Sequence, residues 1–442
     1  MKQIEHAPNW ISEKLYNEVN RLRLNDDFQV LVNELNEKYL YWDKVKYHTS
    51  AYVTDPKVLW AALKLSRTIN AKKIQFREFK FIFNLTDSIQ KGLHEFDLYI
   101  SGHLGTQNLI PEGDKKRYLV SSIMEEAIAS SQIEGAVTTR KQAKEMLRKN
   151  IKPKNKSEQM ILNNYITIRH IVAIKDEPIT TEKLLEIHQL ISNQTLADRK
   201  DEGAFRSDND VKVIDVANGK IVHSPPDYQD IPKLMEEVFL FFNKDKNGHF
   251  IHPIVKGCIV HFMIGFIHPF ADGNGRTARA LFYWYLLKNG YWLTEYLSIS
   301  RLIVKSKAQY ARAYQYTELD ENDLTYFIIY KIKTMQLAFD GLIEYIQLKT
   351  NEKRKTLNFQ KIKGINSRQA QILKWLFEEP ELMFSVKELE TRLSVSNQTA
   401  RTDLTELVNL GYLEQIDLNN KTKGFCRTDN FEIVLSKELP KT

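Results

Sequence analysis

The sequence predicts a mainly α-helical protein of about three domains, and three observations support this. The chain has 442 residues, of which 43% are hydrophobic and 27% are charged, so it can fill hydrophobic cores and is not disordered overall. Apolar residues recur at helical spacing through most of its length. Turn signals flanked by strand-like residues occur at 208–226, around Asn218-Gly219, and again at 411–427.

The helical patterns follow one another along the chain and define its domains. Several helices are expected within 1–110, one of them starting at Pro56, where a missing N–H does no harm. Further helical patterns cover 116–149, 158–174, 181–192, 229–243, 254–266, 275–289, 306–317 and 323–347. We therefore expect an N-terminal helical region over 1–110, a core over 111–350 and a charged, basic linker over 351–364.

Residues 365–442 have a different pattern. Short helices are expected at 367–377, 385–393 and 397–410, followed by a hairpin over 411–427. Helix, short turn, helix and hairpin in this order are typical of a winged helix-turn-helix domain.

Composition favours a cytoplasmic location. The two cysteines, Cys258 and Cys426, are far apart and do not form a disulfide framework. The first residues, MKQIEHAPNW, lack the apolar stretch of a secretory signal. No apolar run approaches the ~20 residues of a membrane span. The net charge of +7 is modest and does not by itself indicate a polyanionic partner.

The stretch HPFADGNGRTAR, residues 268–279, concentrates chemically active side chains. Pro269 must end the preceding helix, and glycines then lead into the start of the next one. Free N–H groups at a helix N-terminus bind anions, and Arg276 and Arg279 would add charge-assisted contacts to phosphate. Asp272 is a suitable ligand for Mg²⁺ beside phosphates, and His268 can accept a proton near neutral pH. The stretch predicts phosphoryl or nucleotidyl transfer.

These residues match the signature of the Fic family, H-P-F-x-[D/E]-G-N-G-R-x-x-R, without departure. The resemblance implies a compact helical core that transfers AMP from ATP to a Ser, Thr or Tyr hydroxyl of a target protein. It implies that His268 is the general base, that Asp272 holds Mg²⁺ and that Phe270 is buried. The residues implied to contact the nucleotide are Gly273, Asn274, Gly275, Arg276, Thr277, Ala278, Arg279 and, further along, Ser306. Family members often carry Asn where Ser306 aligns.

A second motif implies self-inhibition. Residues 130–135, SSQIEG, resemble the inhibitory pattern [S/T]-x-x-x-E-[G/N] of the same family, with Ser130 and Glu134 at its fixed positions. The resemblance implies that Glu134 pairs with Arg279 and so removes the cation that would hold the terminal phosphate. Because the motif precedes the core, the similarity is to the class with an N-terminal inhibitory helix.

Three expectations concern partners. The hairpin at 208–226 resembles the family's flap, whose exposed edge can pair with an extended target segment. Self-modification and homodimers are common in the family and are both compatible with the sequence. The winged helix leaves DNA and protein partners open, since 365–442 carries ten basic and twelve acidic residues and the helix at 397–410 includes Arg401 but also Asp403 and Glu406.

Two alternatives to AMP transfer follow from the same residues. One is a Fic enzyme that transfers another group or removes AMP, with Glu134 orienting a water. The other is a DNA-binding regulator whose Fic core only senses a nucleotide.

Overall fold

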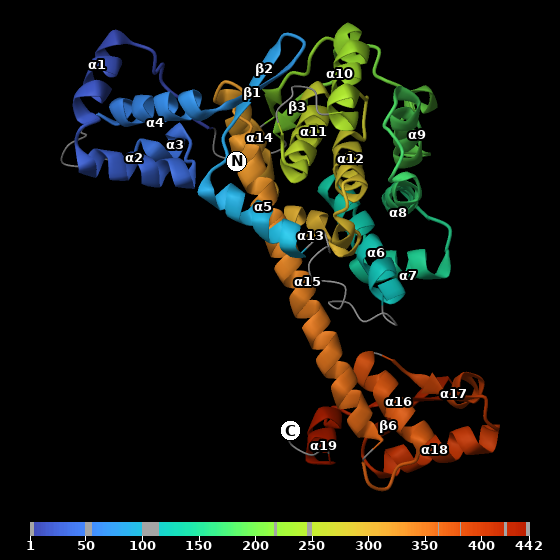
Figure 1. The fold of residues 1–442 in the computed structure, drawn as a ribbon. Coiled ribbons are helices and arrows are strands. Elements are labelled where there is room, and N and C mark those ends of the chain that lie inside the picture. The colour runs from blue at the N-terminus through green and yellow to red at the C-terminus, as the bar shows by residue number, and fades with distance from the viewer. Residues whose placement is uncertain are drawn as a thin grey trace. The chain divides into compact units, whose positions relative to one another are not determined.

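The computed structural model describes residues 4–48, 55–99, 115–215, 219–244, 250–360, 362–380, 382–419 and 422–438. The chain forms two compact units, Met1–Leu342 and Ile343–Thr442, and helices dominate both (Figure 1). Within the described ranges, no helix is long and apolar enough to cross a membrane.

The first four helices enclose an aromatic core. They are α1 (Glu13–Leu22), α2 (Asp26–Lys38), α3 (Trp42–Val45) and α4 (Pro56–Asn70). The side chains of Ser12, Asn25 and Asp55 accept a backbone N–H in the first turns of α1, α2 and α4, and Pro56 begins α4 as expected. Tyr41 and Trp60 meet edge to face in this core, with ring centroids 5.8 Å apart.

A hairpin follows that the sequence interpretation missed, since only helices were expected within 1–110. Strand β1 (Lys72–Phe76) pairs antiparallel with β2 (Phe79–Phe83), and alternate side chains point into the core. Arg77 takes the left-handed turn conformation, φ 51°, and its N–H donates to the carboxylate of Glu237 at 3.0 Å. The turn therefore lacks the Asn-Gly or Asp-Gly pair that marks a hairpin in sequence.

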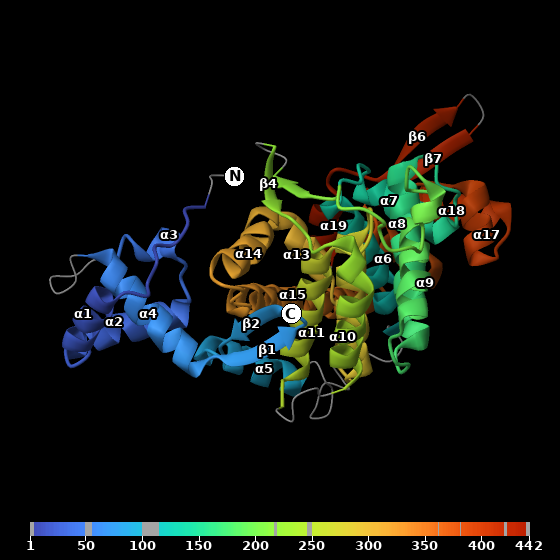
Figure 2. The same ribbon diagram turned by 90° about the horizontal axis from the view of Figure 1, so that it is seen from above.

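Helix α11 (Pro253–Ile267) is the centre of the first unit. Nearly all of its residues are buried, so neighbours cover it on all sides. Helices α10 (Ile231–Asn243) and α12 (Asn274–Lys288) pack against it (Figure 1, Figure 2). Among the described residues, the unit also contains α5 (Asp87–Tyr99), α6 (Lys115–Ile133), α7 (Arg140–Lys149), α8 (Lys156–Ile174), α9 (Thr181–Ser192), α13 (Ile299–Lys305), α14 (Lys307–Leu319) and the first part of α15 (Thr325–Phe359), with short 3₁₀ turns at Arg199–Asp201, Tyr228–Asp230 and Trp292–Tyr296.

The predicted hairpin of this unit is present. Strand β3 (Val213–Asp215) pairs antiparallel with β4 (Lys220–His223), and Gly219 has φ 70° in the turn. Asn218 lies outside the described residues. Ile214 and Ile221 face each other across the pair and are 52% and 58% exposed. The hairpin thus presents apolar side chains to solvent.

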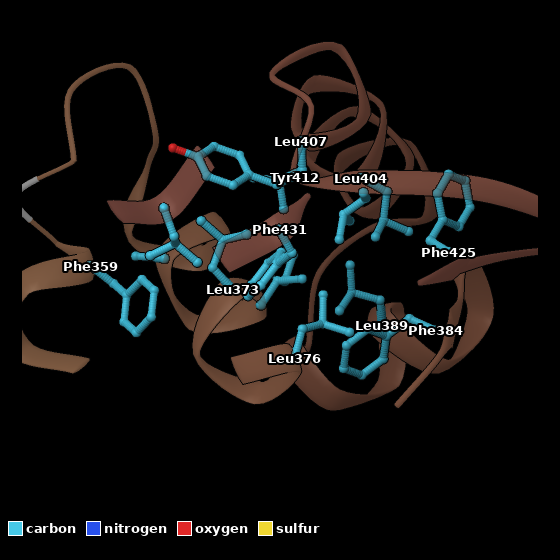
Figure 3. Packing of buried hydrophobic residues seen from close by; sticks show 14 of the residues in the cluster. Phe359, Leu373, Leu376, Phe384, Leu389, Leu404, Leu407, Tyr412, Phe425 and Phe431 are labelled. Carbon is cyan, nitrogen blue, oxygen red and sulfur yellow. The ribbon is translucent and has the colours of Figure 1, made fainter. Parts of the chain in front are cut away.

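The C-terminal unit has the predicted winged helix-turn-helix arrangement. Its elements are α16 (Ser367–Glu378), β5 (Phe384–Ser385), α17 (Val386–Leu393), α18 (Asn397–Asn409), β6 (Leu413–Asn419), β7 (Thr422–Arg427) and α19 (Phe431–Glu438). The strand order is β5-β7-β6, so β5 completes a three-stranded sheet that the sequence did not indicate. Figure 3 shows Leu373, Leu389, Leu404 and Phe425 meeting in one apolar core.

The segment 351–364, expected as a linker, begins inside a helix. Helix α15 (Thr325–Phe359) continues through the first part of it, and Phe359 and Ile362 pack into the C-terminal core.

Candidate active site

The loop 268–273 connects α11 to α12 and begins the predicted site. His268 ends α11 in a left-handed conformation, φ 50° and ψ 57°, while its N–H still donates to Ile264 O at 3.0 Å. Gly273 precedes α12 with φ 87°, where a side chain would be strained and its Cβ would lie 3.2 Å from Nε2 of His188. The loop therefore turns sharply at both ends.

The imidazole of His268 is held in one tautomer. Nδ1 lies 3.1 Å from the carbonyl oxygen of Gly265. A carbonyl can only accept, so Nδ1 carries the proton and Nε2 is the acceptor of the neutral ring. Burial is the main cause that lowers the pKa of His268 from its ordinary value. The geometry and the pKa shift together leave Nε2 able to take up a proton at neutral pH.

Asn274 fixes the shape of the loop from within. Its amide accepts from the N–H of Phe270 at 2.9 Å and donates to the C=O of the same residue at 2.7 Å. Asn274 is 2% exposed, and Phe270 is fully buried, as the resemblance implies. The Asn274 side chain therefore stabilises the loop, and only its backbone N–H belongs to the start of α12.

His188 of α9 supports the loop, and the sequence interpretation did not single it out. Its ring stacks on Phe270, with centroids 3.7 Å apart and planes 3° apart. Nε2 donates to the carbonyl of Asp272 at 2.8 Å, and Nδ1 accepts from the N–H of Gly203 at 3.1 Å. Burial lowers the pKa of His188 to about 4, so the ring stays neutral. The helical spacing of apolar residues in α9 predicts only that this residue faces the core.

Arg206 joins the loop to the base of the β3–β4 hairpin. Its Nε donates to the carbonyl of His268 at 2.9 Å, and its backbone N–H donates to Pro269 O at 2.9 Å. Nη2 donates to Pro226 O, on the far side of the hairpin. His223, at the end of β4, has Nε2 2.7 Å from Phe266 O and Nδ1 2.8 Å from the Glu318 carboxylate. These contacts give Arg206 and His223 structural roles beside the catalytic candidate.

Both arginines of the signature are almost completely buried. Arg276 is 1% exposed, with Nη1 donating to Ile191 O at 2.9 Å, while Arg279 is 2% exposed. Within the described part of the chain, Nε of Arg276 and Nη1 of Arg279 are buried N–H groups without a hydrogen-bond partner. A buried N–H without a partner is costly, so both guanidiniums keep a donor that can bind an anionic group.

The other signature residues surround these arginines. Glu134 packs directly against Gly275. A side chain at this position would clash, because its Cβ would lie 2.2 Å from Oε1 of Glu134. Thr277 and Ala278 are buried, and the Thr277 hydroxyl donates to Gly273 O at 3.0 Å. Their side chains thus face the interior, and the nucleotide contacts expected of these two residues stay a prediction.

The predicted contact between Glu134 and Arg279 is formed. Nη2 of Arg279 donates to Oε1 of Glu134 at 2.8 Å and to Ser130 O at 3.0 Å, and Nε donates to Ser130 Oγ at 2.9 Å. Burial is the largest single effect and would lower the pKa of Arg279, but the charge and hydrogen bond of Glu134, together with the nearby Tyr310 and Glu126, outweigh it and raise the pKa. A carboxylate therefore lies against Gly275 at the N-terminus of α12, where an anion is expected to bind.

Two further residues were predicted to belong to the site, Asp272 and Ser306. The Asp272 side chain is 55% exposed, and Oδ1 accepts from the N–H of Gly273 at 2.5 Å. The Ser306 hydroxyl donates to Leu302 O at 2.9 Å and lies 2.9 Å from the Tyr330 hydroxyl. Over the described ranges, no group of three or more His, Cys, Asp or Glu side chains could hold a metal ion.

Comparisons with known proteins identify two domains in the chain. Residues 178–286 match the Fic/DOC family, and residues 368–425 match an HTH domain. The curated "Protein adenylyltransferase Fic" of Nematostella vectensis is 35% identical over 117 residues, which cover 26% of this chain and 25% of that protein. The protein of the same name from Drosophila melanogaster is 28% identical over 202 residues, covering 44% of this chain and 37% of that protein. The chain spans less than two-fifths of the length of these relatives.

Solved structures share the fold. A Fic family protein from Desulfovibrio desulfuricans superposes with a TM-score of 0.50 at 22% identity, covering 78% of this chain and 97% of that one. Fic-1 from C. elegans superposes with a TM-score of 0.50 at 16% identity, covering 76% and 88%. The chain therefore contains a Fic/DOC family domain followed by a C-terminal helix-turn-helix domain.

Proposed function

We propose that the chain is a protein adenylyltransferase, which transfers AMP from ATP to a Ser, Thr or Tyr hydroxyl of a target protein and is inhibited by Glu134. One observation carries the proposal: the loop that holds His268 as a neutral base leads into a helix start where two buried arginines keep unpaired N–H groups. A base for an alcohol and a cationic site for phosphates are what nucleotidyl transfer requires.

His268 acts on the acceptor. With Nδ1 bound to Gly265 O, Nε2 removes the proton from the target hydroxyl as its oxygen attacks the α-phosphorus of ATP. The oxygen–phosphorus bond to the acceptor forms, the bond between the α- and β-phosphates breaks, and pyrophosphate leaves. The N–H groups of the first turn of α12 and the guanidinium of Arg279 stabilise the negative charge of the phosphates.

Mg²⁺ fits this site only together with the nucleotide. Asp272 offers one exposed carboxylate beside the start of α12, and the described residues provide no cluster that could bind a metal alone. A single carboxylate is a usual protein contribution to a Mg²⁺ that keeps waters and phosphate oxygens as its other ligands. When bound, the ion would neutralise phosphate charge.

Glu134 inhibits the reaction by taking the place of a phosphate. Its carboxylate holds Nη2 of Arg279 and lies against Gly275, so a terminal phosphate cannot bind there without repulsion. ATP would then bind without the alignment that His268 needs.

The β3–β4 hairpin aligns the acceptor. Ile214 and Ile221 are exposed on a two-stranded sheet, and Arg206 and His223 fasten its base next to His268. A target segment that pairs with a free strand edge would bring its hydroxyl toward the base through main-chain hydrogen bonds. A flexible segment of the chain itself could be modified in the same way.

Labelled ATP tests the proposal. Glu134→Gly protein with Mg²⁺ and a cell lysate is expected to transfer label from the α-phosphate and none from the γ-phosphate, and adding His268→Ala should abolish the transfer. Transfer from the γ-phosphate would indicate a kinase, and unchanged transfer by the His268→Ala variant would contradict the assigned base.

The C-terminal domain supports a second function, DNA binding. The two acidic residues of α18 that disfavour DNA binding are buried or paired. Asp403 is 1% exposed and accepts from Arg368 Nε at 2.7 Å, and the carboxylate of Glu406 accepts from the side chain of Gln369. Apart from Glu406, the exposed side chains of the helix are polar or basic, namely Asn397, Gln398, Arg401, Thr402, Thr405 and Asn409. Such residues suit contacts to base edges and phosphates.

Binding of a random-sequence DNA duplex, followed by fluorescence anisotropy, tests this second function. Arg401→Ala is expected to weaken binding and to lower its dependence on salt, while Lys374→Ala on α16 serves as the control. Equal loss in both variants, or no binding by the unaltered chain, would favour a protein partner.

A further inference from the structure

We propose that Lys307 is a positioning residue for self-inhibition: by binding the C-terminal end of α6, it holds Glu134 on Arg279. The inference rests on the proposed function and assigns a regulator of the same site. The ammonium of Lys307, at the start of α14, donates to Gln132 O at 2.8 Å and to Ile133 O at 3.2 Å. These are the last two residues of α6, directly before Glu134.

The backbone carbonyls at the C-terminal end of α6 accept hydrogen bonds from several other residues. The last four carbonyls of a helix lack partners within the helix. Ser130 O accepts from Arg279, and Ser131 O accepts the N–H groups of Glu134 and Ala136 at 3.1 and 3.0 Å. Gln132 O accepts from Gly135 N at 3.3 Å as well as from Lys307, and Ile133 O accepts from Lys307. A lysine at a helix C-terminus also interacts favourably with the helix dipole.

Glu134 depends on this turn because it lies just beyond the helix. Gly135 follows with φ 91°, so the chain reverses directly after the inhibitory residue. The carboxylate reaches Arg279 only while the last turn of α6 stays wound. Without the ammonium, Ile133 O and one lone pair of Gln132 O would turn to water, and the end of the helix would fray more often.

Helix α13, which directly precedes α14, contacts α6 at a second point. The buried carboxylate of Glu126, in the middle of α6, accepts from the N–H of Ser300 at 2.9 Å and from its hydroxyl. Ser306 lies between α13 and α14, and its hydroxyl is hydrogen-bonded to the Tyr330 hydroxyl of α15 at 2.9 Å. These bonds hold the backbone from which the Lys307 side chain projects. Because that side chain is exposed, it can be replaced without disturbing a hydrophobic core.

A double-mutant comparison tests the inference. Lys307→Met is expected to raise the initial rate of AMP transfer roughly threefold to tenfold, the effect of about one charge-assisted hydrogen bond at a solvent-exposed position. In the Glu134→Gly background the same change should leave the rate unaltered, because no inhibitory contact remains to be positioned. Lys307→Arg should keep the low rate, and Lys305→Met, an exposed lysine on α13, is the matched control.

A readout without activity separates this inference from the proposed function. Hydrogen exchange at the amides of Glu134 and Ala136 should become faster in Lys307→Met and not in Lys305→Met. Faster transfer in both backgrounds, or unchanged exchange and an unchanged rate beside an active Glu134→Gly variant, would overturn the inference. No transfer by Glu134→Gly, together with faster exchange in Lys307→Met, would contradict the proposed function and leave the contact at α6 standing.

Discussion

Replacing Glu134 in two steps separates its charge from its shape. In Glu134→Gln the amide oxygen can still accept from Nη2 of Arg279, whereas Glu134→Gly removes the side chain that lies against Gly275. A charge-assisted hydrogen bond contributes about 1.5–3 kcal/mol. Because the Glu134 side chain is 31% exposed, solvent screens the pair and the lower end applies.

The expected rates follow from this value. About 1.5 kcal/mol corresponds to roughly a tenfold change, so Glu134→Gly should transfer AMP at least about ten times faster than the unaltered chain. Glu134→Gln loses only the charge, so its rate of AMP transfer should increase less, by roughly threefold. Intact-mass measurement of AMP added per unit time, in the presence of ATP, Mg²⁺ and lysate, gives both rates.

Glu125→Gln is the matched control for Glu134. Glu125 lies on the same helix but pairs with Arg140 and Lys144, away from Arg279. An equal rise in this variant, or a larger rise for Glu134→Gln than for Glu134→Gly, would refute the argument that the carboxylate blocks the phosphate site.

Three further predictions concern the loop. The lowered pKa of His268 means that the base stays neutral as the pH falls through the ordinary histidine value of 6.5, so kcat/KM of Glu134→Gly should decline only below that pH; a decline that begins above it would contradict the assignment. Phe270→Ala should reduce the free energy of unfolding by about 3–5 kcal/mol in urea titrations, because the ring is fully buried on His188; a loss under about 1 kcal/mol would contradict this packing. Asn274→Ala should slow transfer by roughly 10²-fold or more, because misplacement of a catalytic loop is costly, and a rate equal to that of its parent would show that the loop keeps its shape without this amide.

Much of the site could be predicted because its residues are contiguous. Residues 268–279 combine a helix end, glycines and arginines within one stretch, and local backbone rules then fix how they are arranged. The pair of Glu134 with Arg279 joins distant segments, and only the resemblance to a known family brought these two residues together. The burial of the Thr277 and Ala278 side chains could not be predicted, since the period of a helix shows its buried face only when all its neighbours are known.

Other features left no local signal. The β1–β2 hairpin turns at Arg77, a residue type that rarely adopts this conformation, and a carboxylate from another helix supports it. His188 reads as a core residue of an amphipathic helix, and Arg206 reads as a charge near a turn. Their importance comes from carbonyl groups that tertiary contacts bring to them, which is information that the order of residues does not carry.

Calorimetric titration with ATP and Mg²⁺ tests most directly the claim that residues 268–279 form a phosphate site which Glu134 occupies. Glu134→Gly is expected to bind ATP, and the double variant Glu134→Gly/Arg279→Ala is expected to bind it at least about tenfold more weakly. Equal affinities in the two variants, or no heat of binding by Glu134→Gly, would contradict the claim.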